Sequence, residues 1–114
     1  MTNKHLIAAS TKPLVLSILS HHKSYGYQII KNIKQLSDGQ LEWSEAMLYP
    51  VLKRMESDRL IESEWVILES GRKRKYYKIT EKGKQAREET KAQWINVHQL
   101  LSRLWSGNVQ LELG

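Results

Sequence analysis

The sequence predicts a mainly helical α+β protein, in which three helices are followed by a two-stranded hairpin and one long final helix. Three observations predict this order. Apolar residues recur at three- and four-residue spacing in segments that begin near positions 24, 44 and 81, as they do on one face of a helix. Apolar and polar residues alternate on both sides of a turn at 69–72, as they do in a hairpin. The 114 residues, 40% hydrophobic and 26% charged, fit one small domain with an extra terminal helix.

The first helix is expected over residues 12–21, after a helical turn near 5–9. Pro13 suits the first turn of a helix, because its missing N–H would have no partner there. Ser10 or Thr11 is then the expected N-cap. The apolar run PLVLSIL supplies the buried face of this helix.

The second and third helices carry their own capping residues. Ser24 can cap the second helix, and Gly39 is expected at its end as the left-handed residue after the C-cap. A short strand is expected at 41–43. The third helix begins after Ser44, and Pro50 lies in its second turn. A proline there removes one backbone hydrogen bond and favours a kink.

The hairpin is expected to pair a strand at 61–68 with a strand at 74–79. Side chains on a strand alternate between its two faces. Tyr77 and Ile79 therefore share one face of the returning strand, and we expect that face to cover the core. Thr80 follows directly and is expected to cap the long helix.

Three helices followed by a hairpin form a winged helix-turn-helix, whose third helix enters the major groove and whose hairpin is the wing. We therefore expect residues 1–80 to form a winged helix-turn-helix DNA-binding domain. Residues 81–106 are expected to form a dimerisation helix, ended by Gly107, and residues 107–114 a flexible tail. The formal net charge of +6 agrees with an anionic partner such as double-stranded DNA.

Three segments of the chain, SYGYQIIKNI, MLYPVLKRMESDRLIESEW and RKYYKITEKG, resemble the PadR family of bacterial transcriptional regulators. The resemblance covers roughly residues 13–84. The positions that fit the two main motifs of the family are Leu48, Tyr49, Leu52, Arg54, Glu56, Leu60 and Ile61, and then Arg74, Tyr76, Tyr77, Thr80 and Gly83. Met55 stands in place of leucine, and Arg59 in place of the usual glycine. We expect either a slightly different exit from the third helix or a strained Arg59 with a positive φ, which costs about 1–2 kcal/mol.

The outer face of the third helix supplies one set of candidate DNA contacts. Leu48, Leu52 and Met55 point inward by helical spacing, so other residues are left to face the DNA. The candidates are Ser44, Ala46, Met47, Tyr49 and Lys53. Small and apolar groups can contact thymine methyls, while hydroxyl and ammonium groups can contact phosphates. The alternative for Met47 and Tyr49 is packing over Trp43.

The wing and the second helix supply the other candidates. The cations Arg72, Lys73, Arg74 and Lys75 are expected to contact phosphates or the minor groove. The alternative is that they only keep an exposed strand soluble. The family resemblance implies that the DNA backbone lies near the start of the second helix, which makes Tyr25 a candidate contact. Tyr27 is expected in the core.

The long helix predicts a homodimer. Thr90, Trp94, Val97, Leu101 and Leu104 follow the alternating four- and three-residue spacing of a coiled coil, and the first helix is expected to pack beside them. The predicted interface consists of Leu14, Ile18, Trp94, Val97, Leu101, Leu104 and Trp105. A two-fold dimer would bind a near-palindromic operator.

The segment KAQWINVHQLL resembles the multidrug-sensing (LmrR-like) branch of the PadR family. The resemblance implies that Trp94 faces its symmetry mate and that a planar aromatic effector stacks between the two indoles. Ser17, Thr90 and His98 are expected to line the same space. The alternative is that Trp94 seals a dry interface. The resulting prediction is a DNA-binding transcriptional regulator, acting as a repressor that a small aromatic ligand relieves.

Other classes of function are less well supported. A winged-helix module that binds protein instead of DNA remains the alternative. No enzyme and no catalytic residue are expected, since the four histidines are scattered and no phosphate-binding loop or H-E-x-x-H motif is present. The absence of cysteine removes Cys-based metal sites, and we expect neither metal nor cofactor. With no membrane-length apolar run and no signal peptide, we expect a cytoplasmic protein that makes no membrane contact.

Overall fold

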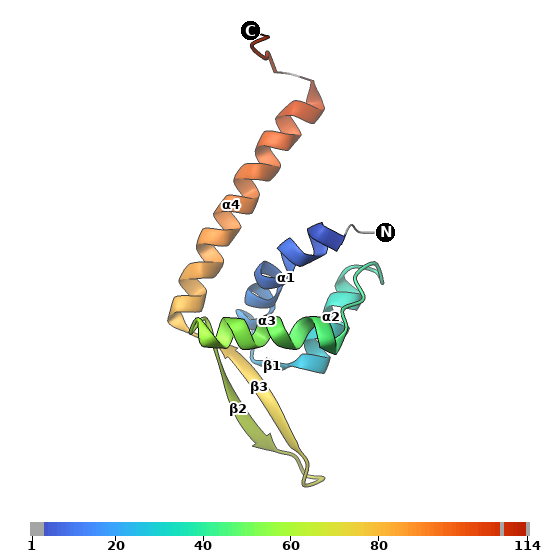
Figure 1. Cartoon of the computed structure of the whole chain (residues 1–114), viewed down its shortest axis with the longest axis vertical. Coiled ribbons are helices and arrows are strands. Elements are labelled where there is room, and N and C mark those ends of the chain that lie inside the picture. Colours follow the sequence, from blue (N-terminus) through green and yellow to red (C-terminus); the bar gives the residue numbers. More distant parts are fainter. Residues whose placement is uncertain (1–3, 108, 114) are drawn as a thin grey trace.

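The computed structural model describes residues 4–107 and 109–113. Residues 1–3 of the predicted DNA-binding domain, and residues 108 and 114 of the predicted tail, lie outside the described residues. The elements, in chain order, are α1 (Lys4–Leu19), β1 (Ser24–Tyr25), α2 (Gly26–Leu36), α3 (Glu45–Ser57), β2 (Ile61–Ile67), β3 (Lys73–Ile79) and α4 (Glu81–Ser106). Figure 1 shows the hairpin and the free end of α4 projecting from opposite ends of a small helical body. The expected α+β winged fold with a long last helix is confirmed.

The sheet is antiparallel, with the strand order β1-β3-β2. In the hairpin Ile61 pairs with Ile79 and Ile67 pairs with Lys73. The hairpin turn is closed by a hydrogen bond of 2.8 Å from the Leu68 N–H to the Arg72 carbonyl, and Gly71 has a φ of +85°. Glycine suits this left-handed position because it has no Cβ to clash.

The first helix differs from the expected 12–21. It starts at Lys4, runs through the expected turn at 5–9 without a break, and ends at Leu19. Ser10 and Thr11 are not caps: their hydroxyls donate to the Ile7 carbonyl at 2.9 and 2.8 Å, one turn back along the helix. Pro13 therefore lies inside α1, where it donates no backbone hydrogen bond. The buried residues Thr11, Val15, Leu16 and Leu19 lie on both sides of the proline, on the face of α1 that packs inward.

The prediction that Ser24 caps the second helix is wrong. Ser24 belongs to β1 and pairs with Tyr77, and its hydroxyl donates to Gln28 Oε1 at 2.9 Å. Tyr25 occupies the N-cap position without making a side-chain capping bond. The cause is long-range pairing, since β1 forms only because β3 offers it an edge.

The end of α2 also differs in detail. Asp38, with a φ of +53°, takes the left-handed position after the C-cap, and Gly39 follows with a φ of +81°. The Gly39 N–H donates to the Lys34 carbonyl at 2.8 Å, which closes a Schellman motif one residue earlier than expected. Residues 41–43 form no strand. Trp43, one of the residues that predicted the strand, is buried in the core instead.

The third helix begins where the sequence predicted, directly after Ser44. The Ser44 hydroxyl accepts from the Met47 N–H at 3.1 Å. Pro50 does not end the helix, and α3 runs as one continuous ribbon in Figure 1. Arg59 has a φ of +62°, so the expected strained exit is confirmed.

One hydrophobic core joins the helices to the base of the hairpin. Leu48, Leu52 and Met55 of α3 face it as expected, and so does Tyr77 of β3. The other members are Val15, Leu16, Leu19, Ile29, Ile33, Trp43, Leu60 and Ile61. The core ends at the base of the wing, because the outer halves of β2 and β3 have no helix packed against them in Figure 1.

The start of α4 is held tightly against the chain between α3 and β2. The Thr80 hydroxyl accepts from the Gly83 N–H at 3.0 Å and donates to the Leu60 carbonyl at 3.0 Å. A Cβ placed on Gly83 would lie 2.0 Å from that carbonyl oxygen and 2.7 Å from Ile79 Cγ1. At the other end, Gly107 terminates the helix with a φ of +75°.

We expect Gly83→Ala to lower the free energy of unfolding by about 3 kcal/mol, because a backbone carbonyl cannot move aside for the added methyl group. Chemical denaturation measures the change. Gly71→Ala is the matched control. Its Cβ meets nothing within 4 Å, so only the positive φ opposes it, at about 1 kcal/mol. Equal losses in the two variants would contradict the steric explanation.

Candidate nucleic-acid interface

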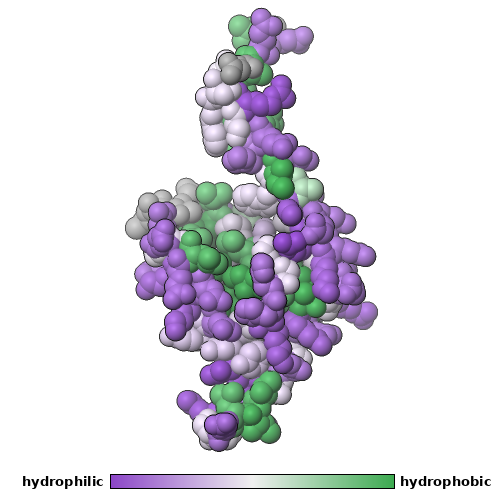
Figure 2. Space-filling model, turned by 180° about the vertical axis from the view of Figure 1, so that it is seen from behind, coloured by the Kyte–Doolittle hydropathy of each residue, from purple (hydrophilic) through white to green (hydrophobic). Residues whose placement is uncertain are grey.

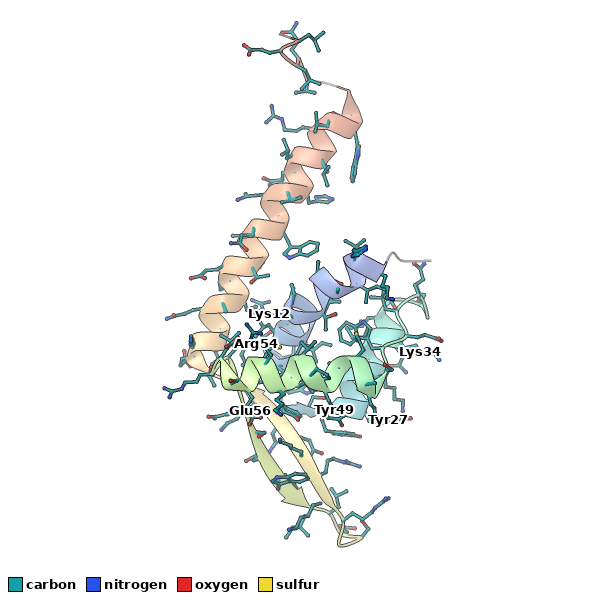
Figure 3. The ribbon with its side chains drawn as sticks, in the orientation of Figure 1. Lys12, Tyr27, Lys34, Tyr49, Arg54 and Glu56 are labelled. Atoms are coloured by element: carbon teal, nitrogen blue, oxygen red, sulfur yellow. The ribbon has the colours of Figure 1, made fainter. Side chains whose placement is uncertain are left out.

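An open groove of about 530 Å³ separates the wing from the helices. It is lined by Tyr25, Gly26, Tyr27, Tyr49, Trp65, Leu68, Arg72, Lys73, Arg74, Lys75 and Tyr77. In Figure 3 Tyr27 and Tyr49 lie on the side of α3 from which the hairpin projects, whereas Lys12 and Arg54 lie on the other side. The groove therefore combines an aromatic floor with a cationic rim, and the rim suits a polyanion.

Tyr49 of α3 is seated against the first residue of α2. A Cβ at Gly26 would lie 2.6 Å from the Tyr49 hydroxyl oxygen and 2.8 Å from its Cζ, so glycine is what allows the ring this position. Burial raises the pKa of the Tyr49 phenol, and the Glu45 carboxylate raises it further. At neutral pH this phenol is protonated, as any tyrosine with an ordinary pKa would be, and it can donate a hydrogen bond to an anion.

The four wing cations have different surroundings. Arg72 and Lys73 are exposed at the tip. The Arg74 guanidinium carbon lies 4.0 Å from the centre of the Tyr25 ring. The ammonium group of Lys75, whose side chain is 35% exposed, lies 3.8 Å from a carboxylate oxygen of Glu56. The first two cations face solvent, and the second two contact other side chains.

The groove contains six of the ten predicted DNA-binding residues: Tyr25, Tyr49, Arg72, Lys73, Arg74 and Lys75. The other four lie along α3 outside it. Ala46 and Lys53 are exposed, Ser44 is engaged as the helix cap, and Met47 packs against the core. Packing of Met47 agrees with the alternative that the sequence left open for this residue.

Five groove residues were not among the predicted DNA contacts. Gly26 is the first residue of α2 and Tyr77 belongs to the core; the other three are Tyr27, Trp65 and Leu68. Tyr27 was expected in the core, but it is 60% exposed because the inward face of α2 is defined by Ile29 and Ile33. Trp65 is 64% exposed. It shares a sheet face with Ile61 and Tyr77, and this alternation could have identified it, since the face continues past the end of the core. Leu68 carries no comparable signal.

A second, smaller pocket of about 200 Å³ lies between α1 and α4. It brings together three of the four predicted effector residues, Ser17, Thr90 and Trp94, with Pro13, Arg87, Lys91 and Ile95. His98 is not part of this lining. The helix pair α1 and α4 thus forms a partly apolar site in a single chain, open on the side where Trp94 is 42% exposed.

Beyond this pocket α4 has no cover. Every residue from Lys91 to Leu101 is exposed, and Figure 1 and Figure 2 show the outer part of α4 standing clear of the other elements. The exposed residues include the predicted interface members Trp94, Val97, Leu101, Leu104 and Trp105, together with Ile95 and Leu100, which were not predicted. Leu14 and Ile18 of α1 are half-buried and pack against the core.

Two kinds of site were also sought within the part of the chain that the structure describes. No cluster of three or more His, Asp or Glu side chains there could hold a metal ion. None of the helices described there has the length and apolarity needed to cross a membrane.

The chain matches the Transcriptional regulator PadR-like family over residues 15–89. It is similar to the structure of a PadR-like transcriptional regulator from Bacillus cereus, with a TM-score of 0.78 and 31% identity, over 90% of this chain and 97% of that one. A PadR family transcription regulator from Clostridium difficile gives a TM-score of 0.73 and 33% identity, over 84% of this chain and 98% of that one. The transcriptional regulator YqjI of Escherichia coli is 35% identical over 80 residues, which are 70% of this chain and 37% of YqjI.

The matched region begins within α1 and ends within α4. It contains every residue that lines the groove between the wing and the helices. The members of this family are regulators of transcription and not enzymes. The chain belongs to the PadR-like family of DNA-binding transcriptional regulators.

Proposed function

We propose that this protein is a dimeric, sequence-specific repressor of transcription that releases its operator when a small planar aromatic molecule binds. The observation that carries the DNA-binding part is the groove, in which one side of α3 and the cationic wing face a common space. In this arrangement α3 enters the major groove, and the wing follows the adjacent phosphate backbone.

The contacts divide by chemistry. The Tyr49 hydroxyl donates a hydrogen bond to a phosphate beside the start of α2, and Lys53 extends the cationic surface along α3. Ala46 is small and exposed, which suits contact with a thymine methyl. The wing cations contribute the largest share of affinity through release of counterions from the DNA.

A second copy of the chain is the proposed cover for α4. The helix has 26 residues and is about 39 Å long, and its exposed half carries Trp94, Val97, Leu101 and Leu104. Seven large apolar side chains on a solvent-exposed helix would be unfavourable in a monomer. A two-fold pairing of α4 helices would place two α3 helices on one face and match a near-palindromic operator.

The pocket beside Trp94 is the proposed effector site. In a dimer its open side would face the partner, so that a flat ligand could stack on the two indoles. The similarity of this part of α4 to the multidrug-sensing branch supports this assignment. The ligand would bind best to a dimer arrangement in which the spacing of the two α3 helices does not match the operator. It would then weaken DNA binding, and DNA would weaken ligand binding by the same factor.

DNA binding is tested by fluorescence anisotropy with a labelled duplex from the region upstream of the protein's own coding sequence. Wild-type binding should weaken steeply as salt rises. Changing all four cations at 72–75 to Gln should weaken binding at least about a hundredfold and reduce the salt slope by about two or more per protomer. Lys84→Gln with Arg103→Gln, which removes two cations from α4, is the control. A wild-type protein that shows no salt-dependent binding to the duplex would favour the protein-binding alternative.

Dimerisation is tested by light scattering after size-exclusion chromatography. The wild type should elute with twice the 13.3 kDa mass of one chain, and Leu101→Glu should convert it to monomers, because it places a charge in an apolar seam. Gln99→Glu introduces the same side chain on the opposite side of α4 and should leave the dimer intact. A monomeric wild type would exclude the proposed interface.

The effector site is tested by calorimetry with proflavine, a planar aromatic cation. We expect binding to the wild type and at least about a tenfold weaker binding to Trp94→Leu, since one stacking surface per protomer is lost. Trp65→Leu, which changes an indole on the wing, is the control. Equal affinity of Trp94→Leu and wild type would show that Trp94 only fills the interface.

A further inference from the structure

We propose that the four consecutive cations of the wing form two pairs with different roles. Arg72 and Lys73 contact phosphates, whereas Arg74 and Lys75 are positioning residues that hold the wing at a fixed angle to the helices. Arg74 is held by Tyr25 and Lys75 by Glu56. Each of these two contacts is called a brace below. This inference rests on the proposed DNA-binding function and assigns separate tasks within the same site.

The brace on one face of β3 is aromatic. The Arg74 guanidinium carbon lies 4.0 Å from the centre of the Tyr25 ring. The Tyr25 ring meets the Tyr76 ring at 5.4 Å between centres and 71° between planes, and the two residues are register partners across β1 and β3. The Lys23 ammonium group lies 5.5 Å from the Tyr76 ring and is paired with Glu64 at 2.9 Å. Stacking of this kind suits arginine, whose guanidinium is planar and weakly hydrated.

The brace on the opposite face is ionic. Glu56 lies in the last turn of α3, and its carboxylate accepts a hydrogen bond from Ser63 of β2 and lies 3.8 Å from the ammonium group of Lys75 on β3. The same ammonium group lies 5.6 Å from the Tyr77 ring and 5.9 Å from the Trp65 ring. One carboxylate at the end of α3 thus connects that helix to both strands of the wing.

Alternation along β3 explains why two neighbouring cations serve two different braces. Arg74 and Lys75 point to opposite faces of the strand, so the strand is held from both sides at consecutive positions. Arg72 and Lys73 lie beyond these braces. Within the described part of the chain neither takes part in a salt bridge or a cation–π contact.

The two roles leave different traces in a binding experiment. Loss of a phosphate contact reduces the number of counterions released, so the salt slope falls. Loss of a brace leaves the phosphate contacts of the complex intact. The wing must then be ordered when DNA binds, and the free energy needed for this lowers the affinity. In that case affinity falls and the salt slope does not change.

The experiment measures anisotropy with the labelled operator over a range of KCl concentrations. Arg72→Gln and Lys73→Gln should each reduce the salt slope by about one per protomer. Arg74→Gln should weaken binding about tenfold with an unchanged slope. Lys78→Gln is the matched control, because it removes the same charge from the same strand at a cation paired with Glu62; it should change neither quantity.

Conservative variants of Tyr25 separate stacking from a direct contact. Tyr25→Phe keeps the ring and should bind like the wild type, while Tyr25→Leu should lose about tenfold in affinity. Because Tyr25 and Arg74 act as a unit, the double variant Tyr25→Leu with Arg74→Gln should be little weaker than either single change. Thermal unfolding confirms that each variant is folded.

For Glu56, charge alone and a positioning role predict changes in DNA affinity of opposite sign. By charge alone, Glu56→Gln removes a negative group from the DNA-facing side and should strengthen binding. As a brace, Glu56 is needed to hold the wing, and we expect Glu56→Gln to weaken binding several-fold. Stronger binding by this variant would overturn its positioning role.

Two further outcomes would overturn the inference. One is a fall in salt slope for Arg74→Gln equal to that for Arg72→Gln. The other is equal loss of affinity in Tyr25→Phe and Tyr25→Leu, which would make the phenol a direct contact. A wild-type chain without salt-dependent DNA binding would instead overturn the proposed function itself, so the two failures are distinguishable.

Discussion

The direction of α4 relative to the winged domain depends on the backbone carbonyl group of Leu60. Its oxygen accepts from the Thr80 N–H at 3.1 Å and from the Thr80 hydroxyl at 3.0 Å, and it lies against the bare Cα of Gly83. The carbonyl before it, that of Arg59, accepts from the same hydroxyl at 2.7 Å. The exit of α3, the end of β3 and the start of α4 therefore meet within one small set of backbone contacts.

The contacts around the Leu60 carbonyl explain both the positive φ of Arg59 and the need for glycine at position 83. Arg59 is held at a φ of +62°, where a side chain with a Cβ is strained. The strain is tolerated because the Leu60 N–H donates to the Met55 carbonyl at 2.9 Å, which ends α3 in a Schellman motif. The carbonyls of Arg59 and Leu60, which follow the helix, then contact Thr80. Gly83 is required for a different reason, since its position needs close approach and not a special φ. The basic hairpin and the long helix thus take their directions from the same few atoms.

Local signals in the sequence predicted most of the elements, and long-range pairing accounts for what they missed. Ser44 and Thr80 were identified as caps because a cap depends only on the next three residues. Ser24 has the same chemistry, but pairing with Tyr77, far along the chain, placed it in a strand. Tyr27 was misplaced because its spacing fits Ile30, whereas the start of α2 turns Ile29 toward the core. The wing cations were found by composition, but their separate partners depend on where α2 and α3 lie in space.

The same geometry limits how a change at the α1–α4 pocket could reach the groove between the wing and the helices. Ser17 and Trp94 lie in that pocket, and two connections lead away from it. Along α1, the residues next to Ser17 enter the core through Leu16 and Leu19, where Leu48 and Leu52 of α3 also pack. Along α4, the path ends at Gly83, where no side chain is present to absorb movement. If an effector binds in this pocket, a rigid contact at the base of a helix about 39 Å long would convert a small rotation at Trp94 into a change in the angle of the whole winged domain. On the proposed function, the spacing between the two α3 helices would then respond to the pocket while the structure within each α3 stays unchanged.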